Sequence, residues 1–168
     1  MSDVTNQSSE IQKLRHLIED IGVAMLTTTA DDGSLHSRPM ATNGHIDDDL
    51  SLWFFTYADT LKTEEIGQDR HVNVSFSCPE KQKYVSVSGK AHLVTDQSKI
   101  EELWTPDQQA WFPKGLDQPG LALLKVIPRM AEYWDAPPQP IAQTIAMVKA
   151  VTTGKRAHPG EHETVNLG

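Results

Sequence analysis

The sequence has almost no cysteine and no long apolar run. Cys78 is the only cysteine among 168 residues, so no disulfide can form within the chain, and this suits a reducing compartment. No apolar stretch approaches the length of a membrane span, and the polar, acidic start, MSDVTNQSSE, lacks the pattern of a signal peptide. We therefore expect a cytoplasmic protein with no membrane partner, in which Cys78 is a small core or strand-end residue.

Positive charge is also scarce. The chain has 15 lysines and arginines against 23 aspartates and glutamates, which gives a net charge of −8 and a pI of about 5.3. A general nucleic-acid binder needs a basic surface to replace phosphate counterions, so we expect no nucleic-acid partner. Single arginines and lysines remain able to hold one small phosphate group.

Several motifs that carry chemistry are missing or misplaced. There is no glycine-rich phosphate loop, no Rossmann fingerprint and no Gly-x-Ser-x-Gly elbow. HPGEH, residues 158–162, fits a His-x-x-Glu-His zinc pattern, but Pro159 and Gly160 disfavour the helix that this chemistry needs. The three aspartates at 47–49 are typical of a solvated turn. We therefore expect no metal site.

What is present is a succession of β-prone segments. An amphipathic helix is predicted at 11–21, and two strands flank Asp31-Asp32-Gly33, where Asp-Gly indicates a hairpin. Four further strands are predicted at 50–57, 71–78, 83–94 and 121–135. Gly89 inside the third of these indicates a bulge or a close backbone approach, and Pro128 indicates a bend in the last.

Short helices separate or follow these strands. They are predicted at 60–68, at 97–104 and, as a brief helical turn, at 106–115; a last apolar-faced helix follows at 140–153, and residues 155–168 are expected to form a flexible tail. The order lacks the strand-helix alternation of a doubly wound sheet. We predict a mainly β fold, a six-stranded antiparallel barrel with peripheral helices, as a single domain over residues 1–154.

The stretch LHSRPM, residues 35–40, places an arginine and a proline on one predicted strand. Proline removes a backbone donor and is disfavoured inside a sheet, whereas the planar guanidinium of arginine suits phosphate. The strand therefore either lies at an edge or presents Arg38, Pro39 and Met40 to a ligand. Proline would keep the backbone stiff there, and methionine packs softly on a ring.

A second candidate lies where SLWFFTYADTLK passes from a strand into a helix. A helix start offers free backbone N–H groups, to which hydroxyls and a lysine add. Thr56, Thr60 and Lys62 form a candidate phosphate cup, to which Arg38 adds a bidentate contact if its strand is a neighbour. The alternative is a core strand followed by a capped surface helix, with Lys62 in water.

Tryptophan is the third feature, with Trp53, Trp104, Trp111 and Trp134 in a short chain. A planar aromatic cofactor needs flat apolar walls and a few polar groups. Trp134 lies in AEYWDAP at the end of a predicted strand and is a candidate for such a wall. Trp53 is equally well explained as a core residue.

Together these motifs resemble a known family. LHSRPMAT, LWFFT, LKTEEI, KYVSVSGKAHLVTD and AEYWD, in this order and spacing, are similar to the general stress protein 26 family, within the flavin-binding split-barrel superfamily of pyridoxamine 5'-phosphate oxidase. The resemblance covers about residues 18–135. It implies a six-stranded split barrel and a homodimer that binds FMN at the subunit interface.

The resemblance also implies roles for residues along the first of these motifs and at the end of the last. Arg38 would serve the phosphate or ribityl end of the flavin, and the backbone of Pro39 and Met40 would meet its ring. Trp134 would come from the partner subunit and flank the ring.

At the other motifs the family's contacts run along the ribityl-phosphate chain. Phe55 and Thr56 match the strand end beside that chain, and Thr60, Leu61 and Lys62 match a Ser-Arg-Lys phosphate motif of the oxidase. Leu61 stands where the oxidase has an arginine, so the resemblance implies either a weaker affinity for phosphate or more dependence on Arg38.

The oxidase's C-terminal Arg-Leu-x-x-Arg segment has no match here, so pyridoxamine phosphate oxidation itself is not expected. We predict an FMN-dependent oxidoreductase that acts on an unknown small molecule; the alternative is a flavin carrier, sensor or store without turnover. FAD is the second cofactor candidate. The acidic charge disfavours the polyanionic deazaflavin F420, and haem would need an axial ligand, for which His36 is the nearest candidate.

Overall fold

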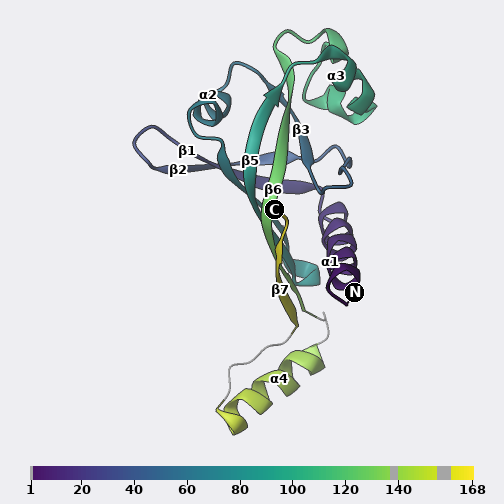
Figure 1. The fold of residues 1–168 in the computed structure, drawn as a ribbon, viewed down its shortest axis with the longest axis vertical. Helices are drawn as coiled ribbons and strands as arrows, with labels where there is room; N and C mark the ends of the chain where they lie inside the picture. Colours follow the sequence, from purple (N-terminus) through teal and green to yellow (C-terminus); the bar gives the residue numbers. More distant parts are fainter. Residues whose placement is uncertain (1, 137–139, 155–159) are drawn as a thin grey trace.

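The computed structural model describes residues 2–136, 140–154 and 160–168, and one antiparallel sheet dominates it (Figure 1). Within these residues the sheet has seven strands: six follow the order β2-β1-β4-β5-β6-β3, and β7 pairs with β6. The strands are β1 (Val23–Thr29), β2 (Leu35–Ala41), β3 (Leu52–Tyr57), β4 (His71–Cys78), β5 (Lys83–Val94), β6 (Leu121–Asp135) and β7 (Glu161–Asn166). The expected six-stranded antiparallel split barrel is confirmed.

Helices are peripheral to the sheet, and α4 stands apart from it in the view of Figure 1. They are α1 (Ser2–Glu19), α2 (Leu61–Gln68), α3 (Gln97–Leu103) and α4 (Pro140–Thr153), with short 3₁₀ turns η1 (Pro79–Lys81), η2 (Pro106–Ala110) and η3 (Gly115–Asp117). The first helix begins at Ser2 rather than at residue 11, whereas the last lies where the sequence predicts it. None of the described helices is both long and apolar enough to cross a membrane.

The core forms where the alternating strands turn one face inward. In β1 the side chains of Ala24, Leu26 and Thr28 are buried while their neighbours are not, as a half-buried strand requires. Leu14, with its neighbours Leu17 and Ile18, brings one face of α1 onto this core. A second, smaller cluster packs α3 and Phe112, which follows η2, against β3 and β6.

Gly89 marks the point where β5 and β6 change register. The pairing shifts between Ser88 and Gly89, opposite Pro128. A Cβ atom at Gly89 would lie 2.2 Å from the backbone oxygen of Ile127, closer than any side chain can come. The close backbone approach that the sequence indicates is therefore confirmed, and only glycine fits there.

The prediction of a flexible tail is wrong for the residues that form β7. This strand pairs with Met130–Asp135 of β6, and Val165 within it is buried. The reason is an open edge: β3 pairs only with Leu121–Val126 of β6, which leaves the later half of that edge without a neighbour. The sheet therefore extends beyond residue 154, whereas residues 155–159 lie outside the described part of the chain.

Candidate functional site

The site begins where β2 faces α2. In the β1–β2 pairing Arg38 lies opposite Leu26 and His36 lies opposite Thr28, so both follow the buried face of β1. Period-two alternation places Ser37, which lies between them, and Pro39, which follows them, on the outer face. The strand thus directs an arginine and a histidine toward the helix that follows β3.

Glu65 on α2 receives both of these side chains. Its carboxylate is only 4% exposed; Oε1 lies 2.6 Å from His36 Nδ1, and Oε2 accepts hydrogen bonds from Arg38 Nη2 at 3.2 Å and from the Thr28 hydroxyl. The hydrogen bond from Thr28 holds the pKa of the Glu65 carboxyl below its ordinary value; burial opposes this, and His36 and Arg38 support it. The carboxylate is therefore ionised and paired.

Arg38 is held on two further sides. Its Nη1 donates to the Thr28 hydroxyl at 2.5 Å and to the backbone oxygen of Leu26 at 3.3 Å. Nη2 uses one of its two N–H groups for Glu65. The other N–H of Nη2 and the N–H of Nε form no hydrogen bond to a residue that the structure describes. One edge of the guanidinium thus remains for a ligand.

Lys62 lies beside this guanidinium in the first turn of α2. Burial, together with the charge of Arg38, lowers its pKa. Across the described residues it has no hydrogen bond or ion pair. A half-buried cation that has no anionic partner among the described residues is suited to a negatively charged ligand.

The start of α2 adds backbone donors to this pair. Thr60 is the N-cap, and its carbonyl accepts the N–H groups of Thr63 and Glu64, so the N–H groups of Leu61 and Lys62 at the first two helical positions are the ones left for an anion. The Thr60 hydroxyl lies 3.3 Å from the backbone oxygen of Tyr57, to which it donates.

A cavity of about 270 Å³ adjoins the site. His36 and Glu65 line it, as do Asp31, Asp32 and Glu64. Since the lining carries so many carboxylates, this cavity does not suit phosphate, and the candidate anion position is the unbonded edge of Arg38 together with Lys62.

Other predicted site residues lie mostly in the core. Phe55 is buried against Trp104, with ring centroids 5.5 Å apart, and Thr56 is also buried. Met40 is buried too, so its side chain is not free to pack on a ligand ring, whereas Pro39 is exposed on the outer face. Of the predicted site residues on β2 and β3 other than Arg38, only Pro39 therefore has an exposed side chain, and Leu61 is exposed on α2.

Trp134 lies four strands away from Arg38 along the sheet order. It stacks on His162 of β7, with centroids 4.8 Å apart and planes at 7°. One chain alone therefore does not bring all the predicted residues together. Trp53, in contrast, is confirmed as a core residue: it is buried, and its Nε1 donates to Asp47 at 3.0 Å.

The predicted absence of metal stays a prediction. No cluster of at least three His, Cys, Asp or Glu side chains in the described segments is placed to hold a metal ion. Asp47 of the acidic turn is ionised: burial opposes its ionisation, but hydrogen bonds from Trp53, His45 and Lys125 outweigh it and lower its pKa. Of the HPGEH motif, His158 lies outside the described residues and His162 is part of a strand.

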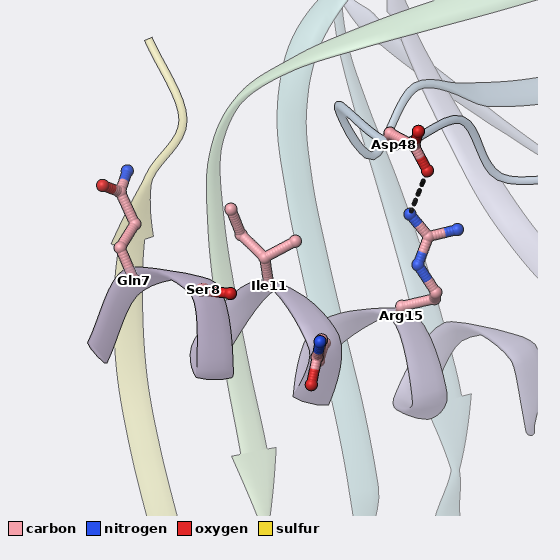
Figure 2. A pocket seen from close by; sticks show the side chains of 6 residues that line it. Gln7, Ser8, Ile11, Arg15 and Asp48 are labelled. Carbon is pink, nitrogen blue, oxygen red and sulfur yellow. Dashed lines mark ion pairs between the residues drawn. The ribbon is translucent and has the colours of Figure 1, made fainter. Parts of the chain in front are cut away.

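An open groove of about 480 Å³ runs along α1, lined by Gln7, Ile11 and Arg15 among others (Figure 2). Arg15 donates to the backbone oxygens of Ile46 and Asp47 at 2.7 and 2.8 Å and lies 3.9 Å from Asp48. Its charge is thus used to fix the loop before β3 to α1, and the groove has no unpaired charge from that residue to offer a ligand.

Sequence reasoning found Arg38 and Lys62 but missed Glu65 and Thr28 as their supports. A weak signal existed: Thr63 and Ile66 mark the buried face of α2, and Glu65 borders it. His36 shares the strand face of Arg38 by period-two spacing. Neither spacing shows that the helix lies against the hairpin.

Comparisons with known proteins agree with this architecture. A family model described as pyridoxamine 5'-phosphate oxidase like matches residues 9–158. Protein bli-3 of Neurospora crassa is 28% identical over 141 residues, covering 79% of this chain and 68% of that protein. The general stress FMN/FAD binding protein from Xanthomonas citri is 32% identical, with a TM-score of 0.64 over 76% of this chain and 89% of that one.

A protein from Clostridium acetobutylicum related to general stress protein 26 shares the fold, with a TM-score of 0.68 and 20% identity over 76% of this chain and 89% of that one. The family model spans most of the sequence, from α1 to beyond α4. The chain therefore belongs to the pyridoxamine 5'-phosphate oxidase-like family, among the split-barrel proteins related to general stress protein 26.

Proposed function

We propose that the chain binds FMN and that Arg38, Lys62 and the start of α2 hold its phosphate. The observation that carries the proposal is Lys62, half-buried next to a second cation and with no anionic partner among the described residues. A phosphate monoester supplies the missing charge, since guanidinium and ammonium groups form strong charge-assisted hydrogen bonds with it. The Xanthomonas citri relative, a general stress FMN/FAD binding protein, supports the same ligand class.

The proposal includes a homodimer with the flavin between two copies. Trp134, the predicted wall of the ring, is four strands from Arg38 in its own chain, so a second copy is needed to bring them together. The outer sheet face supports this, because Met25, Tyr84, Met130 and Trp134 share that face and are exposed. An antiparallel sheet that faces water on one side is normally polar there.

The proposed activity is flavin-dependent oxidation or reduction of a small molecule. A bound flavin supplies the electron-transfer chemistry, and the protein's part is to bind, orient and shield it. Its single free cysteine, partly buried at the end of β4, suits a reducing compartment and supports a cytoplasmic location. The alternative is a flavin carrier, sensor or store, and catalytic turnover of the bound flavin distinguishes it from an oxidoreductase.

The first test is the visible spectrum of purified protein with FMN, FAD or neither added. We expect oxidised-flavin bands that persist through gel filtration, with FMN held at least as tightly as FAD. Arg38→Ala and Lys62→Ala should each weaken FMN binding about tenfold or more, the worth of a charge-assisted hydrogen bond. A colourless protein that takes up no flavin would overturn the proposal, and unchanged affinity in both variants would overturn the site.

The second test adds NADH or NADPH to the flavin-loaded protein without oxygen. Bleaching of the flavin bands with multiple turnovers after air is admitted supports an oxidoreductase. Flavin that stays oxidised with either donor favours the carrier or storage function.

A further inference from the structure

Glu65 is the unexpected group at the candidate phosphate site. A carboxylate repels phosphate, and this one is ionised, 4% exposed and within 3.2 Å of the arginine proposed to bind the ligand. By charge alone its presence weakens anion binding. A buried carboxylate in this position needs another reason.

The contacts around Glu65 supply that reason. Thr28 bridges the two groups, because its hydroxyl donates to Glu65 and accepts from Arg38 Nη1. His36 holds the other carboxylate oxygen at 2.6 Å. The guanidinium is therefore fixed on one side by a carboxylate that is itself fixed, and its Nε–H and the second N–H of Nη2 have no partner among the described residues.

We propose that Glu65 is the positioning residue of the phosphate end: it fixes the Arg38 guanidinium so that its free edge and Lys62 face the phosphate, and it thereby makes the site select FMN over riboflavin. The inference rests on the proposed FMN site. Fixing the guanidinium in advance lowers the conformational entropy lost on binding. A correctly oriented planar guanidinium can then form two parallel hydrogen bonds with the phosphate.

Positioning and simple electrostatics give opposite signs for one substitution. Glu65→Gln removes a negative charge near the phosphate, so electrostatics alone would tighten FMN binding. Loss of positioning would weaken it, because a neutral amide no longer forms the charge-assisted bond that holds Arg38. The sign of the change therefore separates the two accounts.

The experiment is a titration of wild type and Glu65→Gln with FMN and with riboflavin, which lacks the phosphate. We expect FMN affinity to fall about tenfold or more, with riboflavin affinity nearly unchanged. Equal losses for both ligands would indicate a merely structural role and overturn the inference. Unchanged or tighter FMN binding would overturn it as well.

Two further variants serve as controls. Glu64→Gln removes the same charge from the neighbouring, exposed position on α2, and it should leave FMN affinity unchanged or slightly increased. In an Arg38→Ala background, Glu65→Gln should cause no further loss, because Glu65 acts through Arg38. A full additional loss there would contradict the positioning role.

If Glu65→Gln does not fold, Thr28→Val tests the same support by removing the hydroxyl between Glu65 and Arg38. It should lower FMN affinity without lowering riboflavin affinity, and equal or absent effects would overturn the inference. A wild-type protein that binds neither flavin would instead overturn the proposed function, and the inference with it, so the two failures are distinguishable.

Discussion

Lys62 lies half-buried beside Arg38, and burial with that neighbouring charge lowers its pKa below the ordinary 10.5. The folded state thus disfavours the charged lysine relative to the unfolded chain. This is the pattern of a binding residue, whose charge opposes folding until the ligand arrives. The charge of Lys62 should therefore lower the stability of the flavin-free protein and raise its affinity for FMN.

We expect Lys62→Met to raise the melting temperature of the flavin-free protein and to weaken FMN binding. The stability gain should be present at neutral pH and shrink as the pH rises toward 10.5, because the unfolded chain then also loses the lysine proton. Thermal unfolding at several pH values measures it, with exposed Lys114→Met as the control. A lower melting temperature in Lys62→Met at neutral pH would contradict this reasoning.

Glu65 behaves in the opposite way, because its hydrogen bond from Thr28 lowers its pKa below 4.5. The paired carboxylate stabilises the fold above that pH, and this contribution is lost as the pH falls through the lower, folded-state pKa. Glu65→Gln should therefore be about 1–3 kcal/mol less stable than wild type at neutral pH. In urea unfolding, the difference in the free energy of unfolding between wild type and Glu65→Gln should become smaller below pH 4.5. A difference that does not depend on pH would refute the stabilising role of the Glu65 carboxylate.

Sequence reasoning reached the ligand-facing cations but not their supports, for a physical reason. An arginine before a proline in a strand and a lysine at a helix start are unusual locally. A glutamate in TEEI on a charged helix is ordinary, and it becomes buried only because the β1–β2 hairpin lies against α2. Burial of a polar residue is decided by tertiary contact, which local spacing does not encode.

Among the elements, the β5–β6 pair carries the fold's sharpest steric constraint. A Cβ at Gly89 would lie 2.2 Å from a backbone oxygen, and backbone cannot move aside as a side chain can. We expect Gly89→Ala to destabilise the protein by about 1–3 kcal/mol or more in denaturant unfolding. Gly67→Ala in α2, with open space around it, should instead be neutral or stabilising by about 0.5–1 kcal/mol.

Strands were predictable to the extent that their pattern is local. Alternation marks β4 and β5, and Asp-Gly marks the hairpin between β1 and β2, so the antiparallel barrel followed from the sequence. β7 was not predictable, because EHETVN is polar and only Val165 is buried. What orders it is the open edge of β6, which lies elsewhere in the sequence.

At the scale of the whole molecule, the candidate site is divided. Arg38 and Lys62 lie at the β2–α2 end, and Trp134 lies on β6, several strands away. If two copies share two equivalent sites, each site takes its cations from one subunit and its tryptophan from the other. Sedimentation analysis should then show a dimer whose flavin content depends on residues of both chains.

Mixed dimers test this division directly. Lys62→Ala and Trp134→Ala should each bind FMN weakly as homodimers, but a hybrid dimer places both lesions in one site and leaves the other intact. After random re-association of equal amounts, about a quarter of all sites should recover wild-type affinity. Mixing Lys62→Ala with Arg38→Ala, whose lesions lie on the same side of the site, is the matched control, and it should restore nothing. Recovery in neither mixture would mean that Trp134 does not complete the partner's site.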